Sequence, residues 1–199
     1  MDFSLPALSN IGFLMVGLYL ICINRRQPPS YRLLFGPLAI AVGTSSFIYH
    51  LHPTFTSKLI DISVIFLFLS FLVMINLYRM RLAVFNTKRL IELYLVCNLT
   101  TIILLYLTHL EAGVWLFVAF VVLIALTEFF LFATSFPRPD LILFVISIVV
   151  LAVAWQLRMI ESVTILGRTV IISGHALWHG TVSICFLLIY YFHRQMSRK

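Results

Sequence analysis

The stretch Ser173-Gly174-His175-Ala176-Leu177-Trp178-His179 opens the last long apolar segment of the chain. Two histidines four positions apart in a helix lie on one face, about one turn from each other, so both imidazoles can reach a single metal ion. Such an ion needs further ligands. A second group of polar residues can supply them, because Ser46 and His50 end one apolar segment and Asp61 opens the next. We therefore expect the remaining apolar segments to form a frame around these residues.

The composition of the chain is that of a membrane protein. Hydrophobic residues make up 62% of the sequence, charged residues only 11%, and the mean hydropathy is +1.07, far outside the range of soluble globular domains. A chain of 199 residues has room for about seven spans of about 20 residues with short loops. We therefore expect an all-α integral membrane protein, a seven-helix transmembrane bundle that forms a single domain over residues 1–199.

Breaks in the hydrophobic pattern place the seven spans. The predicted spans cover residues 8–23, 33–51, 58–78, 90–108, 114–134, 140–155 and 169–192. Prolines and basic residues interrupt the chain at 24–29 and again at 135–139. The link between the second and third spans, residues 54–57, is so short that these spans must be antiparallel neighbours. The serine and histidine of the second span and the aspartate of the third are therefore expected at the same membrane face.

The distribution of basic residues predicts the orientation of the bundle. One set of alternate loops and the C-terminal end contain Arg25, Arg26, Arg32, Arg79, Arg81, Lys88, Arg89, Arg138, Arg194, Arg198 and Lys199, and the other set contains Lys58, Arg158 and Arg168. Because basic loops stay in the cytoplasm, we expect the N-terminus outside and the C-terminus inside. This topology explains the net charge of +7 without a nucleic-acid partner.

The polar residues together favour a catalytic zinc site within the membrane. His50, His175 and His179 provide three nitrogen ligands and leave a fourth position open to water, an arrangement typical of catalytic zinc. Zinc activates water and polarises a carbonyl oxygen. Asp61 can orient or deprotonate that water, and Ser46, one turn before His50, can hydrogen-bond the water or the developing oxyanion. We therefore predict Zn²⁺ as the cofactor, three histidine ligands, and Ser46 and Asp61 as catalytic residues.

Each of these residues also has a simpler interpretation. An H-x-x-x-H pair in a membrane helix is often a packing pair, and Ser46 alone is typical of a helix interface. Asp61 alone is explained by the favourable interaction of an acid with a helix N-terminus. Five polar residues from three spans at one predicted depth favour the metal site. Glu92 and Glu128 also lie inside predicted spans, where pairing with a loop arginine or an internal cavity explains them equally well, and we assign them no role.

The same residues resemble the signature of the CREST superfamily. The chain contains S-x-x-x-H from Ser46 to His50, an aspartate eleven residues later at Asp61, and H-x-x-x-H from His175 to His179. That superfamily includes alkaline ceramidases, adiponectin and progestin receptors, and bacterial hemolysin III-like proteins. The resemblance implies a seven-helix intramembrane zinc hydrolase in which the three histidines bind zinc and the serine and aspartate contact the zinc-bound water.

One departure from the ceramidase pattern broadens the predicted activity. Alkaline ceramidases carry an acidic calcium-binding stretch near the N-terminus, whereas Asp2 is the only acidic residue before Asp61 here. We therefore expect a hydrolase of a lipid amide or ester, with ceramide-like lipids as the leading substrates. Its partners would be the lipid substrate and the bilayer, in a bacterial inner membrane rather than a eukaryotic endomembrane. The alternative is a receptor or structural membrane protein in which zinc has only a structural role and links the helices.

Overall fold

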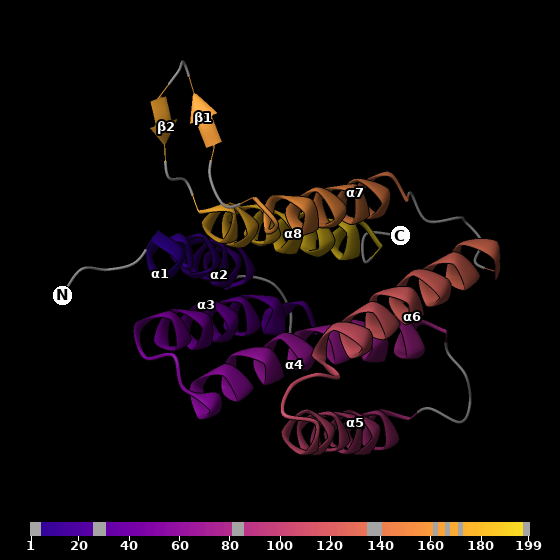
Figure 1. Cartoon of the computed structure of the whole chain (residues 1–199). Helices are drawn as coiled ribbons and strands as arrows, with labels where there is room; N and C mark the ends of the chain where they lie inside the picture. The colour runs from indigo at the N-terminus through magenta and orange to yellow at the C-terminus, as the bar shows by residue number, and fades with distance from the viewer. Residues whose placement is uncertain are drawn as a thin grey trace. The chain divides into compact units, whose positions relative to one another are not determined.

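Helices form almost all of the described structure. The computed structural model describes residues 5–25, 31–80, 86–134, 141–160, 163–165, 168–170 and 173–196. Its elements in chain order, shown in Figure 1, are α1 (Leu5–Ser9), α2 (Ile11–Asn24), the 3-10 helix η1 (Tyr31–Leu34), α3 (Phe35–Leu51), α4 (Phe55–Arg79), α5 (Thr87–Leu107), α6 (Gly113–Thr134), α7 (Ile142–Leu157), β1 (Val163–Ile165), β2 (Arg168–Val170) and α8 (Gly174–Met196). The predicted helical class is confirmed.

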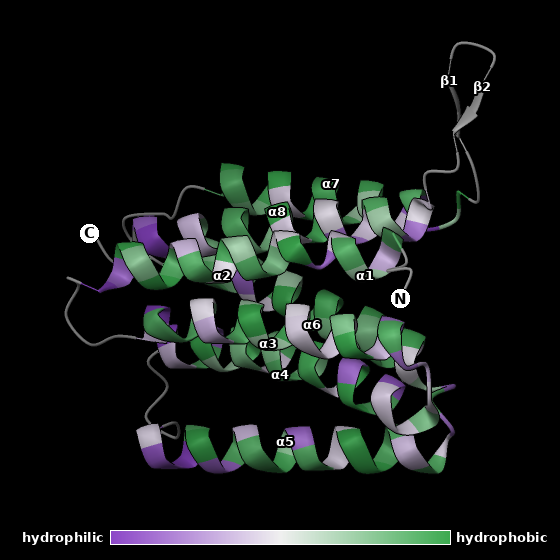
Figure 2. Ribbon diagram, turned by 90° about the vertical axis from the view of Figure 1, so that its left-hand side faces the viewer, coloured by the Kyte–Doolittle hydropathy of each residue, from purple (hydrophilic) through white to green (hydrophobic). Residues whose placement is uncertain are grey.

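Six of the apolar helical segments in the described residues are long enough to cross a membrane. They cover Leu5–Asn24, Tyr31–Leu51, Phe55–Arg79, Thr87–Leu107, Gly113–Thr134 and Gly174–Gln195, and α7 is a shorter apolar helix. Figure 2 shows apolar residues, in green, along the length of α2, α5 and α7. The chain thus has the helices of a multi-pass membrane protein, and its orientation stays a prediction. The predicted breaks at 24–29 and 135–139 lie mostly outside the described residues.

The start of the last predicted span is wrong by five residues. The sequence predicts a helix from residue 169, whereas α8 begins at Gly174 and residues 168–170 form β2. This strand pairs antiparallel with β1, with Val163 opposite Val170. Five of the six residues in the two strands are Val, Ile or Thr, whose branched side chains favour strands over helices. A short hairpin therefore takes the place of the first predicted helical turn.

The chain divides into two compact units. Unit 1 consists of Met1–Thr54 and Asp140–Lys199, and unit 2 consists of Phe55–Pro139. Within unit 1, α2 packs on α3 and α8, α7 packs on α8, and α1 packs on both α3 and α8. Within unit 2, α4 packs on α5 and α6. The single domain expected over the whole chain stays a prediction.

Glycines let α2 and α3 approach each other closely. A methyl group added to Gly17 would lie 2.9 Å from the carbonyl oxygen of Gly36, and one added to Gly36 would lie 2.9 Å from the carbonyl oxygen of Gly17. Further along α3, a methyl group on Gly43 would lie 3.2 Å from the carbonyl oxygen of Asn10. Small residues at such contacts are the usual way in which membrane helices pack backbone to backbone. This contact sets the position of α3, which includes His50.

Aromatic side chains fill the core of unit 1 between α3, α2 and α8. The Phe35 ring meets the Tyr190 ring edge to face with centroids 5.6 Å apart, and Phe13 meets Phe186 in the same way at 5.4 Å. All four side chains are buried. The Tyr190 hydroxyl reaches the side-chain oxygen of Asn24 at 2.7 Å, so its polar end is satisfied within the core.

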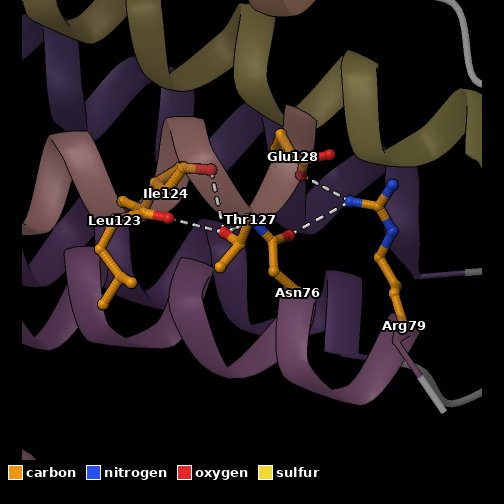
Figure 3. A network of polar contacts seen from close by, with 6 residues as sticks. All are labelled: Asn76, Arg79, Leu123, Ile124, Thr127 and Glu128. Carbon is orange, nitrogen blue, oxygen red and sulfur yellow. Dashed lines mark hydrogen bonds and ion pairs between the residues drawn. The ribbon is translucent and has the colours of Figure 1, made fainter. Parts of the chain in front are cut away.

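Buried polar side chains connect the helices of unit 2 (Figure 3). Nη1 of Arg79, in the last turn of α4, donates to Oε1 of Glu128 on α6 at 2.5 Å and to Oδ1 of Asn76 at 3.1 Å. Asn76 also donates to the Thr127 hydroxyl at 2.9 Å. Glu128 is 1% exposed, so its charge depends on this arginine. The arginine pairing considered for Glu128 from the sequence is present, and the partner is a helical residue rather than a loop residue.

The glycine contact predicts how two alanine substitutions affect stability. Gly17→Ala should destabilise the folded protein by about 1–3 kcal/mol, because its methyl group would lie 2.5 Å from Ile40 Cγ1 and close to the α3 backbone. Gly180→Ala is the matched control, since an added methyl group at Gly180 meets no atom within 4 Å. Thermal unfolding in detergent should show a lower midpoint for Gly17→Ala only. Equal midpoints would contradict the close backbone contact.

The buried ion pair predicts non-additive effects in unit 2. Arg79→Leu leaves the Glu128 carboxylate buried without its cation, which typically costs about 3–5 kcal/mol. The double variant Arg79→Leu, Glu128→Leu removes both charges and should recover most of that loss. Lys88→Ala, which removes the exposed partner of Glu92 at 3.9 Å, should change stability little. A double variant no more stable than Arg79→Leu in detergent unfolding would contradict the pairing.

Candidate metal centre

Three imidazoles meet in unit 1. His50 comes from the last turn of α3, and His175 and His179 come from the first turns of α8. The ring centroids of the three histidines are 4.6 to 5.1 Å apart, and one nitrogen from each lies within 4.8 Å of the other two. His179 is buried, and His50 and His175 are half-buried. The structure therefore brings together the three histidines that the sequence singled out, although His50 lies 125 positions before His175 in the chain.

The start of α8 aims its two histidines at α3. The backbone amide of Gly174 donates to the carbonyl oxygen of Ile160 at 2.9 Å, which ties the start of α8 to the chain that follows α7. A methyl group on Gly174 would lie 2.1 Å from that oxygen, so only glycine permits this contact. From this start, His175 and His179 follow on one face, one helical turn apart.

The spacing of one nitrogen pair fits a tetrahedral metal ion. Nε2 of His50 lies 3.2 Å from Nε2 of His175. Two nitrogens bound to one tetrahedral zinc ion at about 2.0–2.1 Å each would be about 3.3 Å apart. A nitrogen of His179 lies within 4.8 Å of the other two, so it would have to move closer to complete one face of such a tetrahedron, with a fourth position left for another ligand. The donor set, three imidazoles without a carboxylate or thiolate among them, suits zinc, copper, iron or nickel rather than calcium or magnesium.

His179 is held by α1 through one of its two ring nitrogens. Its Nδ1 atom lies 3.0 Å from the Ser9 hydroxyl oxygen and 3.2 Å from the carbonyl oxygen of Pro6, both on α1. The Phe13 ring approaches the imidazole edge with centroids 6.4 Å apart. The Nε2 atom of His179 is thus the nitrogen available for a metal ion.

The structure places the two predicted catalytic residues in different units. Ser46 lies on α3, one turn before His50, and is buried. Among the described residues its hydroxyl has no hydrogen-bond partner, whereas the neighbouring Ser45 hydroxyl donates to the carbonyl oxygen of Val42 at 3.1 Å. Asp61 lies on α4 in unit 2 and is also buried. The predicted contacts of both residues with the metal-bound water stay predictions.

Sequence reasoning missed two features beside the histidines. The first is α1 itself, whose Pro6 and Ser9 contact His179 across 170 or more positions. Pro6 contributes a backbone oxygen, which no sequence pattern reveals. The second is Arg158, just after α7, whose guanidinium lies 5.3 Å from the centre of the Trp155 ring and 6.0 Å from that of Trp178. Arginine and tryptophan together are typical of the membrane interface.

Comparisons with known proteins found no relative of this chain. No family model, curated protein or solved structure matches this chain. The resemblance to the CREST superfamily therefore rests on the residues quoted from the sequence, and membership stays a prediction. What the structure adds is the convergence of the three histidines of that pattern.

The geometry predicts metal binding that depends on three histidines and not on a fourth. Purified protein reconstituted with a transition-metal salt should retain about one ion per chain after gel filtration, measured by mass spectrometry of the metal. His50→Ala, His175→Ala and His179→Ala should each lose most of that ion. His52→Ala is the matched control, because His52 is exposed just beyond α3 and two positions from His50. A metal-free unmutated protein, or equal loss in His52→Ala, would contradict the site.

Proposed function

We propose that this protein is a zinc-dependent hydrolase of the membrane, which cleaves a lipid amide, ceramide-like by preference, or a lipid ester. The observation that carries the proposal is the cluster of three imidazoles within 4.8 Å of one another on two apolar helices. Three histidine ligands with an open fourth position are the arrangement of catalytic rather than structural zinc. A bound zinc ion would supply a Lewis acid that activates water and polarises a carbonyl group.

The protein's own residues have distinct roles in this proposal. His50, His175 and His179 would hold the ion, which would supply Lewis-acid activation of water. Asp61 would accept a proton from that water, as a carboxylate base does in other hydrolases. Ser46, buried one turn from His50, donates a hydrogen bond to the water or to the oxyanion that forms on the substrate carbonyl.

The apolar exterior supports a lipid as substrate. Large hydrophobic side chains are exposed along the membrane helices, among them Met15 on α2 at 66% and Ile184 on α8 at 53%. In a bilayer these side chains face lipid tails. Trp155, Trp178 and Arg158 lie at the end of unit 1 that contains the start of α8. A lipid whose amide or ester group lies near the membrane interface would therefore present its carbonyl at the depth of the histidines.

A structural metal site is the second candidate. The three ligands come from α3 and α8, so a bound ion would connect these two helices of unit 1 directly. Membrane helices lack a strong hydrophobic drive to associate, and a metal staple would stabilise them. In that case the protein would be a receptor or scaffold, and Ser46 and Asp61 would have a packing role and no catalytic role.

Substitution of the two predicted catalytic residues separates these functions. Asp61→Asn and Ser46→Ala should keep the metal ion and lower the rate of fatty acid release about 10²-fold or more, since each removes a group that acts on water. Ser45→Ala is the matched control, because the Ser45 hydroxyl donates to its own helix. The assay uses zinc-loaded protein in liposomes that contain a ceramide or a phospholipid. Hydrolysis that is absent in the unmutated protein, or unchanged in both variants, would favour the structural role.

A further inference from the structure

We propose that α1 is the positioning element of the metal centre: Ser9 and the carbonyl of Pro6 hold His179 in the tautomer that carries its proton on Nδ1, so that Nε2 offers its lone pair to the metal ion. This inference rests on the proposed metal centre and adds residues to it. Ser9 and Pro6 are positioning residues, since they act through His179 and do not contact the ion.

The first observation is that His179 has two polar neighbours on one side of its ring. Nδ1 lies 3.0 Å from the Ser9 Oγ atom and 3.2 Å from the Pro6 carbonyl oxygen. His179 is 5% exposed, so water does not compete for Nδ1. Because α1 packs on α8, these contacts belong to a packed interface and not to a loose N-terminal arm.

The second observation decides the direction of the hydrogen bonds. The Ser9 hydroxyl donates to the Pro6 carbonyl oxygen at 2.8 Å. A hydroxyl group has one proton, so while it donates to Pro6 the Ser9 oxygen accepts from His179. A carbonyl oxygen always accepts, so the 3.2 Å contact of Nδ1 with the Pro6 oxygen by itself favours a proton on Nδ1. Both neighbours of Nδ1 are therefore acceptors. A neutral imidazole carries one N–H, and in His179 that N–H is satisfied on Nδ1, which leaves Nε2 as the unprotonated nitrogen.

The third observation explains why the Pro6 carbonyl is available. At the end of α1 the backbone amide of Asn10 donates to the carbonyl oxygen of Ala7 at 3.2 Å, three residues back, and not to that of Pro6. The side chain of Asn10, which is fully buried, donates instead to the Pro6 oxygen at 2.9 Å. Because the turn between α1 and α2 is tight, the carbonyl oxygen of Pro6 accepts from side chains, including His179, instead of from the backbone amide of Asn10.

The arrangement has the form of an outer shell around a metal ligand. Histidines that bind a metal usually donate their second N–H to a carbonyl or carboxylate, which fixes the ring and the tautomer, and loss of that partner typically weakens metal binding 10- to 100-fold. On the opposite side of the cluster, the Nε2 atoms of His50 and His175 face each other at 3.2 Å. With Nδ1 held by α1, Nε2 is the nitrogen of His179 that remains to join them, in a cluster whose ligand atoms lie within 4.8 Å of one another.

The test compares tautomer and metal affinity in full-length protein with ¹⁵N-labelled histidine. In metal-free protein in detergent, the ring nitrogen shifts of His179, assigned by the loss of its signals in His179→Gln, should report a proton on Nδ1. Ser9→Ala should populate the other tautomer and weaken zinc binding 10- to 100-fold in chelator competition. Ser9→Thr keeps the hydroxyl and should restore both properties. Ser147→Ala is the matched control, because this buried hydroxyl donates to its own helix, to the Phe144 carbonyl oxygen.

The outcomes separate this inference from the metal centre itself. A proton on Nε2 of His179 in the unmutated protein would overturn the inference even if Ser9→Ala fails to fold. Zinc binding by the unmutated protein with an unchanged affinity and tautomer in Ser9→Ala would overturn the role of Ser9 and leave the centre standing. An unmutated protein with the proton on Nδ1 that binds no zinc would overturn the centre alone.

Discussion

Polar groups inside an apolar helical protein must find partners there, because the hydrocarbon around them offers none. This constraint organises both units of the chain. In unit 2 it produces the Arg79–Glu128 ion pair with Asn76 and Thr127 around it. In unit 1 it produces the three-imidazole cluster, whose nitrogens face one another. The helices are otherwise apolar enough to slide and rotate against each other, so these polar contacts supply much of the specificity of their packing.

The two polar centres meet the constraint in different ways. The arginine and glutamate neutralise each other's charge, which accounts for the pair as a structural contact, although Oε2 of Glu128 has no hydrogen-bond partner among the described residues. Three neutral imidazoles have no opposite charges to neutralise. The Nε2 atoms of His50 and His175 face each other at 3.2 Å, and either a ring proton or a metal ion can lie between them. The cluster is therefore the centre with donor atoms suited to a further component, and for that reason we place the proposed chemistry there.

Close backbone contacts fix the positions of the helices that carry the three imidazoles. Gly17 and Gly36 bring α2 against α3, and Gly174 brings the start of α8 against the carbonyl of Ile160. Each contact lacks room for even one methyl group, so the positions of α3 and α8 are set by the backbone and not by flexible side chains. Catalytic and metal sites depend on such rigid support, since a shift of about 1 Å in a ligand is enough to lose function.

The sequence alone determined the helical class, the approximate span positions and the identity of the histidines. Hydropathy and breaks such as the Pro-rich stretch at 24–29 reveal apolar helices because lipid imposes length and composition locally. The spacing of His175 and His179 reveals a shared face because a helix repeats every 3.6 residues. Such local rules fail at residues 168–170, where β-branched residues form a strand instead of the first turn of α8.

Only the tertiary structure decided which distant groups meet. The sequence predicted that His50 joins His175 and His179, but it did not name Arg79 as the partner of Glu128, and both contacts depend on how whole helices pack. The role of α1 was the least visible feature, since its decisive atom is the backbone oxygen of Pro6, and every residue has such an oxygen. That oxygen acquires a role only when the turn at Asn10 releases it from the helix and the packing of α1 on α8 sets it against one imidazole nitrogen.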